Sequence, residues 1–181
     1  MKYEVIFESI TGNTRMLAEA IRRMLGEADC VCFGTPAEKA SGKSGDDAKE
    51  AVFRFIGFWT DKGTCSEAVA SYMESLEGQD VFLFGTAGFG GSDAYFSQIL
   101  SRVSAHLGEG CRIAGTYMCQ GKMPESVRKR YAAMLEENPQ DAKVKAMLDN
   151  YDRALAHPDE SDIEGLQRAA AEAWDKAAAQ K

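Results

Sequence analysis

The chain has 181 residues, of which 45% are hydrophobic and 27% are charged, and its formal net charge is −7. This length predicts one domain with a substantial core, and the negative charge argues against broad binding to nucleic acids. No stretch of about eighteen apolar residues and no basic start before an apolar run is present, so we expect neither a membrane span nor a signal peptide. Five cysteines without a C-x-x-C motif are typical of a protein in the reducing cytoplasm.

Apolar residues recur with a strand-like or a helix-like period along most of the chain, and the two patterns alternate. The predicted strands cover residues 3–8, 29–33, 52–58, 81–85 and 111–118. Helices are predicted at 14–25, from Thr64 to about Gly78, at 95–107, after Pro124, and at about 140–156 and 161–178. Residues 35–49 are rich in small and charged side chains, and we expect a loosely packed crossover there, with a short helix at 46–51.

Three local patterns predict how helices begin. Thr64-Cys65-Ser66-Glu67 has the spacing of a capping box, in which Thr64 would cap the helix that follows. Pro124 suits the first position inside a helix. Ser161, three residues before Glu164, is the expected cap of the last helix.

Five mainly apolar strands that alternate with helices predict an α/β fold, with a doubly wound parallel sheet and helices on both faces. We expect a single domain over residues 1–181, with a core at about 3–137 and additional C-terminal helices at about 140–178. Such sheets bind ligands beyond the carboxyl ends of their strands. The residues with unusual chemistry concentrate in the loops at those ends, at 9–14, 59–64, 86–94 and 119–124.

The loop after the first strand, Ser9-Ile10-Thr11-Gly12-Asn13-Thr14, predicts a site for a phosphate group. A strand-to-helix turn directs backbone N–H groups and the positive end of the helix dipole at one point. Gly12 allows the backbone to approach closely, and hydrogen bonds can be added by the side chains of Ser9, Thr11, Asn13 and Thr14. The alternative is an ordinary helix N-cap, but a cap requires only one such residue, whereas four cluster here.

The same hexapeptide resembles the phosphate loop of the flavodoxins, Thr/Ser-x-Thr-Gly-x-Thr after the first strand, at every defined position. The five-strand pattern is also similar to that family over about residues 3–137, as in a short flavodoxin that lacks the long insertion in the fifth strand. The resemblance implies a flavodoxin-like sheet of order 2-1-3-4-5 and a non-covalently bound FMN. The residues alone would predict only a phosphate-containing ligand on a doubly wound sheet.

In flavodoxins the loops after the third and fourth strands hold the flavin ring between them. By this resemblance Trp59 and Phe89 would cover the ring, although Trp59 could instead be a core or rim residue. The backbone of residues 60–63 would meet the N5 edge of the flavin, and we expect Tyr95 to pack into the helix that follows. The expected cofactor-binding residues of the two loops are Trp59, Thr60, Asp61, Gly63, Thr86, Ala87, Gly88, Phe89, Gly90 and Tyr95.

The loop after the fifth strand contains Cys119 and Lys122. In the implied strand order it lies beside the loop after the fourth strand, so Lys122 would face a flavin edge, a substrate, a partner carboxylate or solvent. Cys119 would lie near the site, but no base is evident that would activate its thiol. His106 and His157 are the only histidines, so we expect no zinc site, no histidine-based triad and no catalytic side chain.

Three hypotheses for the function remain open. The first is an FMN protein that carries one or two electrons between redox partner proteins, which would dock electrostatically on its acidic surface. The second is an NAD(P)H-dependent FMN reductase or quinone reductase, which a single stacking aromatic would favour, whereas two would favour the carrier. The third is a binding module without flavin. The helices beyond Pro139 suit a monomer or a homodimer, and we expect Trp174 to pack within the chain.

Overall fold

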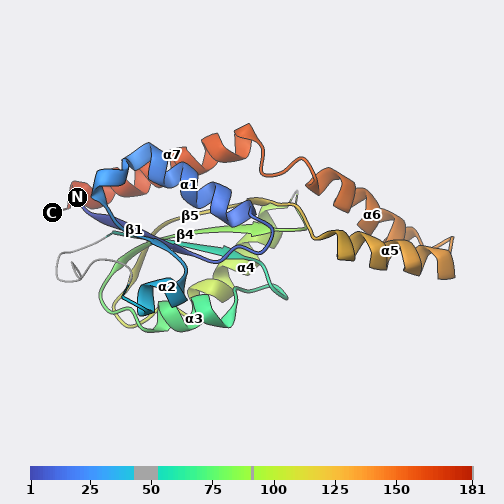
Figure 1. Cartoon of the computed structure of the whole chain (residues 1–181), viewed down its shortest axis with the longest axis horizontal. Coiled ribbons are helices and arrows are strands. Elements are labelled where there is room, and N and C mark those ends of the chain that lie inside the picture. Colours follow the sequence, from blue (N-terminus) through green and yellow to red (C-terminus); the bar gives the residue numbers. More distant parts are fainter. Residues whose placement is uncertain (43–52, 91, 181) are drawn as a thin grey trace.

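The computed structural model describes residues 1–42, 53–90 and 92–180. The described residues form a five-stranded parallel sheet in the order β2-β1-β3-β4-β5, which confirms the expected topology. Its strands are β1 (Tyr3–Phe7), β2 (Cys30–Gly34), β3 (Phe53–Trp59), β4 (Asp80–Ala87) and β5 (Arg112–Gln120). Because all five strands run in one direction, their carboxyl ends meet at a single edge of the sheet (Figure 1).

Helices cover both faces of the sheet, as expected of a doubly wound fold. Figure 1 shows α1 and α7 on one face and α2, α3 and α4 on the other. A short 3-10 turn, η1 (Glu27–Asp29), precedes β2. The helices are α1 (Asn13–Leu25), α2 (Pro36–Ala40), α3 (Glu67–Glu74), α4 (Asp93–Ser104), α5 (Glu125–Glu137), α6 (Ala142–Ala154) and α7 (Glu160–Ala178). None of the helices in the described ranges is long and apolar enough to cross a bilayer.

Two hydrophobic clusters hold these layers together. One lies between the sheet and helices α1 and α7, and the other lies between the sheet and helices α3 and α4. In the first cluster the indole of Trp174 on α7 packs edge-on against Tyr3, with ring centroids 5.6 Å apart, and it stacks on Phe55 at 6.4 Å. Trp174 therefore packs within the chain, as expected.

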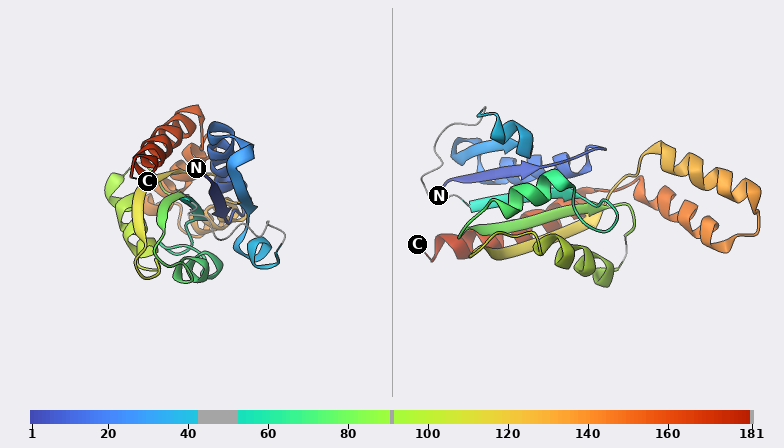
Figure 2. Two further views of the ribbon diagram at one scale, coloured as in Figure 1. Left: turned by 90° about the vertical axis from the view of Figure 1, so that its left-hand side faces the viewer. Right: turned by 90° about the horizontal axis from the view of Figure 1, so that it is seen from below.

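The helices after β5 are arranged differently from the expectation of a core at about 3–137 with added helices at 140–178. Helix α7 packs on β5 and α1 and buries four residues spaced as one helix face: Leu166, Ala170, Ala173 and Ala177. Helix α5 buries only Tyr131 and pairs with α6, and this helical hairpin projects beyond the carboxyl edge of the sheet (Figure 2). The first hydrophobic cluster therefore includes α7 and extends beyond the core expected at about 3–137.

Several helix ends also differ from the expectations. Ser66 caps α3 in place of Thr64, because Thr64 pairs with Asp61 in an antiparallel bridge. Asp159 caps α7 in place of Ser161, through a capping box with Asp162. Pro124 lies just before α5, at its N-cap, and the segment expected as a crossover contains α2, which Thr35 caps. The short helix expected at 46–51 lies outside the described residues.

Candidate functional site

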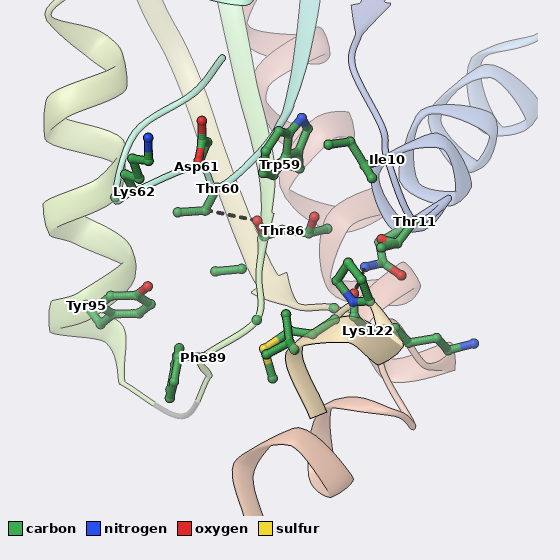
Figure 3. A pocket seen from close by; sticks show the side chains of 18 of the residues that line it. Ile10, Thr11, Trp59, Thr60, Asp61, Lys62, Thr86, Phe89, Tyr95 and Lys122 are labelled. Atoms are coloured by element: carbon green, nitrogen blue, oxygen red, sulfur yellow. Dashed lines mark hydrogen bonds between the residues drawn. The ribbon is translucent and has the colours of Figure 1, made fainter. Parts of the chain in front are cut away.

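A cavity of about 550 Å³ lies at the carboxyl edge of the sheet, beyond β3, β4 and β5 (Figure 3). Its volume is within the range of small-molecule sites, roughly 300–1,000 Å³. Eleven of the residues expected to bind a cofactor line it: Thr11, Asn13, Trp59, Thr60, Asp61, Gly63, Thr86, Ala87, Gly88, Phe89 and Tyr95. Ser9, Gly12, Thr14 and Gly90, also expected there, are not among the lining residues. Most of the residues expected at the site thus share one cavity, and their binding of a cofactor stays a prediction.

The turn before α1 leaves the start of that helix open. Gly12 occupies the N-cap with φ 87°, in the left-handed region that glycine adopts easily, and it offers no capping side chain. The first turn of α1 contains no acidic residue. Since the first N–H groups of a helix have no partner within the helix, those of Asn13 and Thr14 are available to an anion in the cavity, whereas that of Arg15 donates to the Ser9 hydroxyl.

Hydrogen bonds of Thr14 and Asn13 connect this turn to β4 and to the loop after β5. The hydroxyl of Thr14 is fully buried and lies 3.2 Å from the hydroxyl of Thr86 on β4, so it faces the strand and not the cavity. The side-chain amide of Asn13 donates to the carbonyl oxygen of Lys122 at 2.8 Å. A Cβ atom on Gly121 would lie 2.5 Å from that amide nitrogen, so any other residue at this position would have to displace the Asn13 side chain. The backbone of Arg15 donates to the Ser9 hydroxyl at 3.2 Å.

The loop after β3 is closed tightly. Both the backbone N–H and the hydroxyl of Thr60 donate to the carbonyl oxygen of Thr86 at 2.9 Å. Asp61 and Thr64 exchange two backbone hydrogen bonds around Lys62 and Gly63, which have positive φ angles of 49° and 86°. Positive φ at both central residues is typical of a two-residue hairpin turn. Trp59 is the last residue of β3, and its side chain lines the cavity, as does that of Ile10 from the loop after β1 (Figure 3).

The loop after β4 is hydrogen-bonded to β5 and to helix α6 of the helical hairpin. The carbonyl oxygen of Gly88 accepts hydrogen bonds from Gln120 Nε2 on β5 and from Asn150 Nδ2 on α6, both at 3.0 Å. Gln120 Nε2 also donates to Asn150 Oδ1 at 3.1 Å. Asn150 is only 6% exposed, and the three hydrogen bonds of this network are partly buried. The hairpin therefore contributes, together with β5, to holding the loop that carries Phe89.

Two aromatic side chains, Phe89 and Tyr95, line the cavity opposite the phosphate turn (Figure 3). We expected Tyr95 to pack into its helix. Its ring does approach Phe96, with centroids 6.1 Å apart, but it also faces the cavity, because α4 begins at Asp93 and its first turn borders the loop. With Trp59, three of the aromatic residues expected at a flavin ring line the cavity.

Helix α5 of the hairpin forms one side of the cavity, which the sequence did not predict. Val127, Arg130 and Tyr131 of α5 line the cavity, together with Met123 and Pro124. Val127 and Tyr131 are four residues apart and so share one face of the helix predicted after Pro124, but helical spacing does not tell a face that packs on the core from one that faces a cavity. Lys122, whose role the sequence left open, also lines the cavity.

Comparison with known proteins identifies the family. The model of the flavodoxin domain matches residues 4–171. The chain belongs to the flavodoxin family. It is 43% identical over 176 residues to the flavodoxin-like domain-containing protein BilS of Clostridium symbiosum, covering 92% of this chain and 93% of that protein. It is 28% identical over 163 residues to BilS of Clostridioides difficile, covering 90% of each.

Solved flavodoxins share the fold. Oxidised Flavodoxin 2 from Bacillus cereus superposes with a TM-score of 0.52 at 15% identity, covering 97% of this chain and 99% of that one. Oxidised Flavodoxin 1 from the same organism gives 0.51 at 15% identity, covering 97% and 98%. The family and the fold together support a flavin-binding redox function for this flavodoxin.

The thiol of Cys119 does not take part in the site. Cys119 lies in β5, is buried, and does not line the cavity. Burial raises the pKa of this thiol far above its usual range, and the charges of Asp162 and Asp159 raise it further. It therefore stays a protonated, unreactive side chain at neutral pH.

We expect this buried thiol to make the flavodoxin less stable in alkali. A thiol whose pKa is raised on folding contributes stability that is present below its ordinary pKa of 9.0 and is lost as the pH rises above it. Above that pH the free energy of unfolding should fall by up to about 1.4 kcal/mol per pH unit for this one group. Urea unfolding of the wild type and Cys119→Ala between pH 8 and 10.5 checks this, since the decline should be shallower in the variant. Parallel curves would contradict it.

Neither histidine contacts the cavity. His157 Nδ1 lies 2.6 Å from Asp162 Oδ2, next to the capping box of Asp159 and Asp162 that starts α7. The ligand atoms of these three residues lie within 4.8 Å of one another, but both carboxylates already bind the backbone of the helix start. We interpret the group as a helix start.

Proposed function

We propose that this flavodoxin binds FMN in the cavity and passes electrons between redox proteins. The observation that carries the proposal is a single cavity that joins the start of α1, where Gly12 provides no capping side chain, to the aromatic side chains of Trp59, Phe89 and Tyr95. A phosphate group suits the helix start, and a flat ring suits the aromatic walls. FMN combines the two groups in one molecule, and when bound it supplies one- and two-electron redox chemistry.

The residues divide between the two ends of such a ligand. The backbone N–H groups at the start of α1 and the hydroxyl of Thr11 would bind the phosphate, without a cation inside the turn. Trp59 on one side, with Phe89 and Tyr95 on the other, would cover the ring and exclude water from it. The hydrogen bonds of Thr60 and Gly88 hold the two ring loops in place before any ligand arrives.

Three aromatic residues at the ring site favour a carrier over a reductase. A reductase needs one open flavin face for a nicotinamide, whereas here aromatic side chains reach the cavity from both ring loops. Five free thiols also suit the reducing cytoplasm, where we place the protein.

Titration of the purified apoprotein with FMN and with riboflavin tests the cofactor. We expect FMN to bind at least about tenfold more tightly than riboflavin, because only FMN offers a phosphate to α1. Equal affinities, or no binding of FMN, would contradict the proposed site. Anaerobic mixing of the FMN-loaded protein with NADPH then separates the two redox functions. A carrier keeps its oxidised absorption spectrum, and rapid bleaching without a partner protein would show a reductase.

We also expect Trp59→Ala to weaken FMN binding by about tenfold, the effect of losing one aromatic stacking partner. Because the ring is common to both ligands, riboflavin should lose affinity by the same factor. Trp59→Phe keeps an aromatic surface and should bind FMN nearly as the wild type does. Fluorescence titration measures all of these affinities, and an unchanged affinity in Trp59→Ala would place the ring elsewhere.

A further inference from the structure

The charges around the cavity differ in sign from the charge of the whole protein. The net charge is −7, yet the charged residues that line the cavity are Lys62, Lys122, Arg130 and a single acid, Asp61. The three cations come from separate parts of the chain: the loop after β3, the loop after β5 and helix α5. We call these three residues the mouth cations.

The mouth cations keep their charge available. All three are exposed, and within the described residues no carboxylate forms an ion pair with any of them. Arg130 lies over the ring of Tyr131 at 5.4 Å, which fixes its direction without neutralising it. The other two basic residues at the start of α5 are paired: Arg128 with Asp152 at 3.6 Å, and Lys129 with Glu125 at 3.2 Å. The positive charge of this part of α5 is therefore concentrated at the cavity.

Apolar side chains accompany the mouth cations. Ile10 and Phe89, which line the cavity, are 66% and 38% exposed, and Met134, one turn beyond Arg130 on α5, is 41% exposed. Exposed apolar groups beside arginine are typical of protein interfaces. Since the hairpin projects past the carboxyl edge of the sheet, a protein that approaches the cavity meets the sheet edge and α5 together (Figure 2).

We propose that the mouth of the cavity is a docking surface for the acidic face of a redox partner protein. This inference rests on the proposed function, because the electrons of a bound flavin would leave or enter through this mouth. The net charge alone would favour a basic partner. However, charged groups steer a partner mainly through the local field at the contact surface, and here that field is positive. The spread of cations and apolar groups along α5 fits a protein surface better than a small anion.

The rate at which the reduced, FMN-loaded protein is reoxidised tests the sign of this field. Each ferricyanide ion accepts one electron, so two ions reoxidise one fully reduced flavin, which releases its protons to the buffer. Stopped-flow mixing at low and at high ionic strength should show ferricyanide slowing by about tenfold as salt rises, and cationic hexaammineruthenium(III) accelerating. The opposite trends would overturn the inference, since they are those expected from the net charge.

Two triple variants with the same net charge separate local from overall charge. Lys62→Glu/Lys122→Glu/Arg130→Glu should reverse the salt dependence with ferricyanide, after its FMN absorption has confirmed that the cofactor is bound. Lys62→Glu/Arg130→Glu serves if the triple variant does not retain FMN, because it spares the residue beside the phosphate turn. The control, Lys145→Glu/Arg153→Glu/Arg168→Glu, changes exposed residues outside the cavity lining and should behave nearly as the wild type. Equal effects of both triple variants would overturn the inference.

Competition distinguishes a protein surface from a small anion. Poly-L-glutamate, a mimic of an acidic protein face, should slow the reaction with ferricyanide at a far lower concentration of carboxylate than free glutamate does. The mouth-cation variant should lose this competition. If NADPH competes and poly-L-glutamate does not, the mouth binds a small nucleotide and the proposal of a docking surface is wrong. Failure of the wild type to bind FMN would instead overturn the proposed function, so the two failures are distinguishable.

Discussion

Replacing Thr11 by glutamate is expected to lower the affinity for FMN by about 100-fold or more without weakening the fold. Thr11 is exposed, lines the cavity and lies directly before the N-cap of α1. A carboxylate there would repel a phosphate about 4 Å away by roughly 4 kcal/mol at a surface-like dielectric, and each 1.4 kcal/mol corresponds to about tenfold in affinity. The same carboxylate would interact favourably with the dipole of α1, by about 0.3–1 kcal/mol.

Three comparisons make this experiment specific to the phosphate. Thr11→Gln has a similar size without the charge, and it should bind FMN within about tenfold of the wild type. Riboflavin, which has no phosphate, should bind Thr11→Glu almost as well as it binds the wild type. Thermal unfolding of the apoprotein should give an equal or higher midpoint in Thr11→Glu. If Thr11→Glu reduces the affinities for FMN and riboflavin equally, the phosphate does not lie at the start of α1.

Asn150→Leu is expected to lower the free energy of unfolding by about 2–3 kcal/mol, although Asn150 lies on the projecting hairpin. The leucine fills a similar volume but neither donates to the carbonyl oxygen of Gly88 nor accepts from Gln120. Because Gly88 then keeps only one of its two side-chain donors, the loop with Phe89 is less firmly held. We therefore also expect a loss of about tenfold in FMN affinity. Urea unfolding and FMN titration measure the two effects.

Two further variants show whether the hydrogen bonds are the cause. Asn150→Asp keeps the acceptor for Gln120 but replaces the donor to Gly88 by an oxygen, so it should weaken FMN binding as much as the leucine variant. Asp149→Asn changes the exposed neighbour on α6 and should alter stability by less than about 0.5 kcal/mol. Wild-type FMN affinity in Asn150→Leu would mean that the hairpin does not position the loop after β4.

The sequence predicts the sheet well and the position of the hairpin poorly, for a physical reason. Each buried strand is a short apolar run between turn residues, so Val5 or Leu83 indicates its strand without knowledge of its neighbours. An amphipathic helix indicates only that one face is covered. The apolar stripes of α5 and α7 look alike in the sequence, yet Leu166 faces the sheet whereas Val127 faces the cavity.

At the site, too, the sequence predicts residue types better than it predicts the partner of each side chain. The residue types of the loop at 9–14 predict a phosphate site, and of its hydroxyl groups that of Thr11 belongs to a residue that lines the cavity. Thr14, expected to contribute its hydroxyl, directs it toward Thr86, a residue 72 positions away. Asn150 was not anticipated at all, because its partner Gly88 is 62 positions distant and no local motif links them. Such pairs are decided by the packing of elements that are remote in the sequence.

The position of the hairpin between β5 and α7 makes the core discontinuous along the chain. A cut at the exposed hairpin tip, at residues 138–140, would break the chain without removing any residue of the two hydrophobic clusters. The two fragments would still be joined by the apolar contacts of α7 with β5 and α1. The tip is therefore a suitable place to split the protein into complementing halves or to insert a reporter domain. Shortening the chain from its carboxyl end instead removes Trp174 and with it one wall of the core.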